Sequence, residues 1–94
     1  MANFTVRVEL HQAQWSDYEK LHAAMEGKGF SRLISSDDGR RFRLPWAEYN
    51  GKGNLTSEQV LGVAQTAANT TGKANSILVT EANTRAWAGL NQAA

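Results

Sequence analysis

A polar turn near the middle of the chain, SSDDGR at residues 35–40, separates two halves that have the same order of expected elements. Asp-Gly between two apolar runs is typical of a β-hairpin, because glycine readily adopts the positive φ that tight turns need. On each side of the turn the patterns predict a strand, a helix and a strand. The order βαββαβ indicates an α+β fold of the ferredoxin-like type, a four-stranded antiparallel sheet with two helices on one face.

The first half of the chain begins with a strongly alternating segment. Over residues 4–10 apolar side chains alternate with polar ones, which is typical of a strand with one buried face. Ser16 and Glu19 form a capping box that predicts the start of a helix, and the glycine-rich stretch 27–29 predicts its end. We expect the second strand over residues 30–35.

The second half repeats this order. We expect the third strand over residues 40–44, and the proline that follows ends it because proline lacks the backbone N–H that a sheet uses. Residues 46–54 are rich in turn-forming residues and are interpreted as a loop. Thr56 and Gln59 form a second capping box. The alternation over residues 77–81 predicts the last strand.

The chain length of 94 residues suffices for one domain with one modest core. We assign residues 1–82 to this domain and residues 83–94 to a C-terminal tail. The tail carries Trp87 and Leu90, two apolar side chains that need a surface to cover them. Docking on the domain and docking on a partner subunit are both open. We also expect a homodimer, since small chains often gain stability by pairing.

The composition limits the cellular compartment that suits the chain and the kinds of chemistry that its side chains can carry out. The chain has no cysteine, which excludes disulfides and cysteine nucleophiles and suits a cytoplasmic protein. The first residues show no basic segment followed by an apolar run, so we expect no signal peptide. No stretch is long and apolar enough to suggest a membrane partner. With a net charge of only +1, attraction for RNA would have to come from a local patch.

Three arginines are the main candidates for contact with RNA or with a protein partner. In the ferredoxin-like arrangement the first and third strands are neighbours, so the expected register brings Arg41 and Arg43 beside Arg7 on the open face of the sheet. Guanidinium groups bind phosphates bidentately, and Lys52 in the glycine-rich loop could reach the same phosphates. The alternative is that the same arginines pair with Glu9, with Glu81 or with a partner's acidic residues across a dimer interface.

The expected sheet face argues against one class of RNA-binding domain. RRM domains share this strand order, but they stack bases on aromatic side chains of the two central strands. Here the expected register turns Phe4 and Phe42 toward the helices and leaves Thr5, Arg7 and Glu9 outside. Base stacking in the manner of an RRM is therefore not expected.

Histidine offers one catalytic candidate. His11 follows the first strand, where it could act as a general acid or base beside a phosphodiester, although a solvated loop histidine is the simpler interpretation. His22 lies four residues after Tyr18 on the expected helix and is interpreted as a residue at the boundary of the core. Asp37 and Asp38 are successive turn residues without a third ligand, so we predict no metal site and no cofactor.

Several segments of the chain resemble a known family. They are FTVRVEL at 4–10, DYEKLH at 17–22, GF at 29–30, LP at 44–45, AEY at 47–49 and ILVTE at 77–81. Over about residues 3–82 the chain resembles the GhoS-type endoribonuclease antitoxins of type V toxin–antitoxin systems. The resemblance implies a ferredoxin-like fold akin to that of the CRISPR-adaptation endoribonuclease. It also implies RNA binding and cleavage of a toxin messenger RNA.

The chain departs from the family pattern at the end of the first strand. The CRISPR-adaptation relatives carry an Asp there for metal-assisted chemistry, whereas residues 9–12 of this chain read ELHQ. Cleavage would therefore proceed without a metal, by attack of the RNA 2′-hydroxyl. His11 would be its acid/base, and Arg7, Arg41 or Arg43 would stabilise the charged intermediate.

Two functions of different classes are left open by the sequence. The first is an RNA-binding, antitoxin-like protein that acts on toxin messenger RNA, with endoribonuclease activity as the resemblance implies. The second is a non-catalytic interaction protein of a phage or mobile element. It would act as a small dimer that binds a protein target, such as a CRISPR effector or a toxin.

Overall fold

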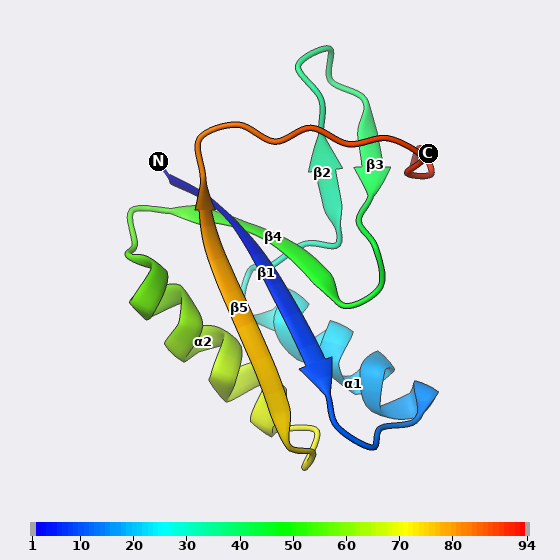
Figure 1. Ribbon diagram of the computed structural model, residues 1–94, viewed down its shortest axis with the longest axis vertical. Helices are drawn as coiled ribbons and strands as arrows, with labels where there is room; N and C mark the ends of the chain where they lie inside the picture. Colours follow the sequence, from blue (N-terminus) through cyan, green and yellow to red (C-terminus); the bar gives the residue numbers. More distant parts are fainter. Residues whose placement is uncertain (1, 94) are drawn as a thin grey trace.

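The computed structural model describes residues 2–93 as an α+β fold (Figure 1). No helix in this part of the chain is long and apolar enough to cross a membrane. The elements are β1 (Ala2–Leu10), α1 (Trp15–Gly27), β2 (Leu33–Ser35), β3 (Arg41–Arg43), β4 (Glu48–Gly53), α2 (Ser57–Asn69) and β5 (Asn75–Ala82).

The main sheet has three antiparallel strands in the order β4-β1-β5. β1 is the central strand of this sheet. The predicted alternation of buried and exposed side chains along β1 is confirmed, because the apolar side chains at positions 4, 6, 8 and 10 are all buried. They share one core with Leu21 and Met25 of α1 and with Val60 and Ala64 of α2. Both helices therefore cover the same face of the sheet, and the polar side chains of β1 lie on the outer face.

The expected single four-stranded sheet is wrong, because β2 and β3 form a separate two-stranded hairpin. Beside β1, on the side away from β5, lies β4 and not residues 40–44; β4 falls in the segment interpreted as a loop. Tyr49 of β4 is fully buried in the core. Gly51 lies against the Phe30 ring, where an added Cβ would come within 2.7 Å of Phe30 Cδ1. A glycine-rich strand of this kind marks a close approach of another residue to its backbone.

The hairpin turn itself is confirmed. Gly39 has a φ of +87°, and the backbone N–H of Ser36 donates to the Arg40 carbonyl at 2.8 Å. The Asp38 carboxylate accepts hydrogen bonds from the Ser36 hydroxyl and from the Arg40 N–H. Ser31, just before β2, and Asn50 of β4 join the hairpin to the main sheet by a backbone bridge, in which they exchange hydrogen bonds of 2.8 and 2.6 Å.

The two helix starts differ in how well the sequence predicts them. At α2 the expected capping box is present: Gln59 N–H donates to Thr56 Oγ1 at 3.1 Å, and Thr56 N–H donates to Gln59 Oε1 at 2.9 Å. At α1 the expected box at Ser16 is wrong, because the cap is Gln14, whose N–H donates to the Asp17 carboxylate at 2.9 Å. A carboxylate in the first turn also interacts favourably with the helix dipole.

The C-terminal tail runs back across the molecule to the hairpin (Figure 1). Its last described residues pair with β3: Arg43 N–H donates to the Asn91 carbonyl, and Ala93 N–H donates to the Arg41 carbonyl. The Trp87 ring lies 5.6 Å from the Phe42 ring, and both side chains are half-buried, as is that of Leu90. The described tail residues therefore contact their own domain, and docking on a partner subunit stays a prediction.

Candidate functional site

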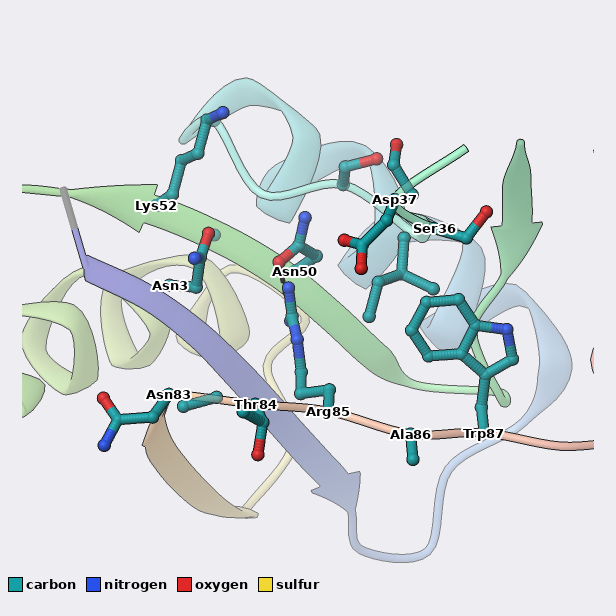
Figure 2. Close-up of a pocket in the computed structure, with 16 residues that line it drawn as sticks. Asn3, Ser36, Asp37, Asn50, Lys52, Asn83, Thr84, Arg85, Ala86 and Trp87 are labelled. Carbon is teal, nitrogen blue, oxygen red and sulfur yellow. Dashed lines mark hydrogen bonds between the residues drawn. The ribbon is translucent and has the colours of Figure 1, made fainter. Parts of the chain in front are cut away.

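A groove of about 830 Å³ lies between the outer face of the main sheet, the β2–β3 hairpin and the tail (Figure 2). Asn3 of β1 and Lys52 of β4 face each other in the sheet register and contribute to it, as does Asn50. Asp37 enters from the hairpin and Trp87 from the tail. The groove is thus assembled from three parts of the chain that are far apart in the sequence, and its lining is mostly polar.

Arg85 is the central cation of this groove. It is half-buried, and its Nη1 donates to Asn50 Oδ1 at 2.8 Å and to Thr5 Oγ1 at 3.3 Å. Burial lowers the pKa of Arg85, which means that its positive charge is poorly solvated. Among residues 2–93 it forms no ion pair, so only neutral oxygens hold the guanidinium. A cation in this position is stabilised by an anionic ligand.

Lys52 adds a second cation to the same groove. Its side chain is exposed, and the part of the chain that the structure describes gives it no ion pair. Asp37 is the one carboxylate among the lining residues, so positive charge is in excess. Asparagine, serine and threonine side chains supply further donors and acceptors. The arrangement suits a ligand that is anionic and rich in hydrogen-bonding groups.

The three arginines singled out from the sequence do not form one patch. Arg7 is exposed on the outer face of β1, where its register partners are Glu48 and Leu78. Arg41 and Arg43 are exposed on β3, in the separate hairpin. The expectation that they flank Arg7 is wrong, because β4 takes the place beside β1. Of the four basic candidates, only Lys52 lines the groove.

His11 lies at the other end of β1 from the groove. Its Nε2 is 2.9 Å from Ser76 Oγ and 3.8 Å from Glu9 Oε1. A serine nucleophile activated by a histidine needs the two ring nitrogens to contact different groups, the hydroxyl on one side and the carboxylate on the other. Here both contacts use the same nitrogen, so this cluster does not have the geometry of a catalytic triad.

A second cluster, which we call the tryptophan cluster, surrounds His22. Trp15 and Trp46 stack with their ring centroids 4.5 Å apart. His22 meets Trp46 edge-on at 4.5 Å, and the Arg32 guanidinium lies 5.0 Å from the Trp46 ring centroid. His22 Nδ1 and Tyr49 Oη share a hydrogen bond of 2.5 Å. Burial, and next the charge of Arg32, lower the pKa of His22 to about 4, so it is a neutral core residue.

The sequence patterns did not predict the groove or the tryptophan cluster, although each has a signal in the sequence. Trp15, Tyr18 and His22 follow helical spacing along one side of α1, which predicts a shared contact surface. Arg85 is the one charged residue in the segment after residue 82. A single charge in an Ala- and Asn-rich tail indicates that this side chain has a specific partner elsewhere in the structure. No group of three or more histidine or acidic side chains within residues 2–93 is placed to hold a metal ion.

Neither a comparison with protein-family models nor one with curated proteins gives a match for this chain. The resemblance to the GhoS-type antitoxins therefore stays a prediction that rests on the segments quoted above.

Proposed function

We propose that this protein is an RNA-binding, antitoxin-like protein and that RNA lies in the groove between the main sheet and the tail. The observation that carries the proposal is Arg85, a half-buried cation held only by neutral oxygens, which shares the groove with the exposed Lys52. Both would contact phosphates. Phosphate contacts supply most of the affinity of proteins for nucleic acids and position the chain for other contacts.

Single-stranded RNA fits this groove better than a duplex does. Proteins that bind single strands combine a positively charged groove with aromatic side chains on which bases stack. Trp87 offers one such ring on the groove wall, and Asn3 and Asn50 offer amides for base edges or the 2′-hydroxyl. The ring comes from the tail and not from the central strands, so the mode differs from that of an RRM.

The position of the groove supports binding of RNA more than cleavage of RNA by His11. Asn3 and Leu10 are about 23 Å apart along a strand that rises roughly 3.3 Å per residue, and His11 follows Leu10. A phosphate held by Lys52 is therefore remote from the His11 imidazole. An antitoxin of this kind would act by occupying the toxin messenger RNA in the cytoplasm. Cleavage, as the resemblance implies it, would need a second stretch of the RNA to reach His11.

The test is a fluorescence-anisotropy titration of labelled single-stranded RNA at several salt concentrations. Lys52→Gln should weaken binding and reduce the slope of log affinity against log salt by about 0.7, the contribution of one phosphate contact on a single strand. Lys20→Gln, which removes an exposed lysine of α1 outside the groove, is the matched control and should change neither quantity. Absence of binding at low salt would overturn the proposal.

The tryptophan cluster favours the second function, binding of a protein target. Trp15 is 67% exposed and Trp46 is 41% exposed, although the two rings stack on each other. Exposed tryptophans are over-represented among residues that dominate the energy of protein interfaces. Trp15→Ala separates the two functions, because it should leave RNA affinity unchanged and weaken binding only where the partner is a protein.

A further inference from the structure

β5 is an open edge of the main sheet (Figure 1). Within residues 2–93 it pairs with β1 alone, and the register runs without interruption from Asn3↔Ala82 to Leu10↔Asn75, so no bulge twists the strand away. The opposite edge is different, because Asn50 of β4 already exchanges backbone hydrogen bonds with Ser31. β5 therefore presents a straight row of backbone donors and acceptors on its free side.

The sequence of β5 lacks the usual devices that protect an edge. Natural proteins place lysine, proline or a bulge on such strands to prevent pairing with another chain. Residues 75–82 read NSILVTEA, with neither proline nor lysine and with Glu81 as the one charged residue. Leu78, at the centre of the strand, is 63% exposed on the outer face. These features indicate an edge that is used and not one that is blocked.

We propose that β5 pairs antiparallel with β5 of a second copy of this chain, about a twofold axis at Leu78. In this register Leu78 faces its own counterpart on the outer face. Ile77 lies opposite Val79 on the side of the helices, and Ser76 lies opposite Thr80 on the outer face. Directly opposite residues of the same character stabilise an antiparallel pair. The two main sheets become one sheet of six strands.

The neighbouring registers are poorer. An axis at Val79 would set Ile77 opposite Glu81, which places an apolar side chain against a carboxylate. An axis at Ile77 would set Val79 opposite Asn75. Only the axis at Leu78 matches apolar with apolar residues on the inner face and hydroxyl with hydroxyl on the outer face. This self-complementarity argues for a second copy as the occupant, since a closed twofold contact uses the same surface on both subunits.

The twofold axis of such a pair is perpendicular to the sheet. It carries the outer face of one subunit onto the outer face of the other, so the two grooves lie on the same side of the assembly. The interface does not depend on the groove, because Leu78 and the rest of the β5 edge lie outside it except at Ala82. A failure to bind RNA would therefore not contradict the β5 dimer, and a failure to form the β5 dimer would not contradict RNA binding in the groove.

Cysteine cross-linking tests the register, because the chain has no cysteine of its own. Leu78→Cys should form a covalent dimer on mild oxidation, since directly opposite Cβ atoms lie about 4.5–5.5 Å apart. Thr80→Cys alone should not, because the two copies of residue 80 lie about 14 Å apart along the strands. A mixture of Ser76→Cys and Thr80→Cys should cross-link. Leu55→Cys, at a leucine that is 44% exposed before α2, is the matched control.

Light scattering on a sizing column measures the assembly itself. The unmodified chain should have the mass of a dimer at high concentration, and Leu78→Lys should shift it to a monomer with an unchanged circular dichroism spectrum, because two lysines would meet at the axis. Leu55→Lys should remain a dimer. A wild-type monomer at all concentrations, a dimer that survives Leu78→Lys, or Leu78→Cys cross-linking no better than Leu55→Cys would overturn the proposal. If β5 pairs with a strand of a different protein and not with itself, the isolated chain should be a monomer at all concentrations.

Discussion

The Arg85 guanidinium donates a hydrogen bond to Asn50 Oδ1 at 2.8 Å and so joins the tail to β4 across the outer face of the sheet. Its second bond, to Thr5 Oγ1, reaches β1. One side chain thus closes the groove and also supplies its half-buried positive charge. The tail and the RNA-binding property that we propose are therefore linked through a single residue.

Replacing Arg85 should affect stability and RNA binding together. Arg85→Gln removes hydrogen bonds made by a charged donor, and we expect the free energy of unfolding to fall by about 1–2 kcal/mol. RNA affinity should fall more than it does in Lys52→Gln, because the groove loses both a cation and its closure. Arg85→Lys, which keeps the charge but not the two-partner geometry, should recover part of the affinity.

Urea denaturation and the anisotropy titration measure these two effects separately. Arg43→Gln is the control for the loss of an exposed arginine and should change the free energy of unfolding by less than about 0.5 kcal/mol. If Arg85→Gln keeps wild-type RNA affinity, the groove is not the binding site.

His22 predicts a pH dependence of stability. Burial first, and the Arg32 charge second, lower its pKa from 6.5 to about 4 in the folded protein. Between these values the unfolded chain binds a proton that the folded chain does not, so the free energy of unfolding rises with pH. The contribution of His22 should be complete above pH 6.5. It should fall by up to about 3 kcal/mol as the pH drops through this window.

Urea titrations at several pH values measure that slope. His22→Phe removes the titrating group and should flatten the dependence on pH, whatever its effect on stability at neutral pH. His11→Gln is the control, because His11 is exposed and its replacement should leave the slope as it is. An unchanged slope in His22→Phe would assign the effect to other groups.

Gly51 predicts a steric effect at β4. An alanine Cβ there would lie 2.7 Å from Phe30 Cδ1, so the ring has to move, and we expect Gly51→Ala to lower the free energy of unfolding by about 1–3 kcal/mol. Gly62→Ala is the control. Gly62 lies in α2 with open space around it, so that change should raise the free energy of unfolding by about 0.5–1 kcal/mol.

A double mutant checks the physical reason. Phe30→Leu removes part of the ring that Gly51→Ala would press upon, so the two changes together should cost less than the sum of the separate changes. Strict additivity in thermal or urea unfolding would mean that the contact between Gly51 and Phe30 is not the source of the effect.

The elements that the sequence predicts correctly are those with local causes. The Asp38-Gly39 turn and the Thr56 cap depend on residues within a few positions of each other, and both are present. The alternation of β1 is equally local, because one buried face is enough to impose it. The start of α1 is the exception. There a Gln14 cap with Asp17 competes with the Ser16 box, and the two motifs are not distinguishable by pattern alone.

The elements that the sequence does not predict depend on contacts between distant residues. β4 has the composition of a loop, and it becomes a strand because it pairs with β1 and because Phe30 packs on Gly51. Once β4 lies beside β1, the arginines of β3 are displaced from Arg7, and the expected patch disappears. The groove likewise depends on contacts between residues that are far apart in the chain: Arg85 returns to Asn50, and the end of the tail pairs with β3.

The most direct test of the proposed function compares two sets of basic side chains in one RNA titration. If RNA lies in the groove, Lys52→Gln should weaken binding of single-stranded RNA and lower its salt dependence. The double variant Arg41→Gln with Arg43→Gln, on β3 outside the groove, should retain wild-type affinity. The reverse result, loss of binding in the β3 double variant and wild-type binding in Lys52→Gln, would contradict it.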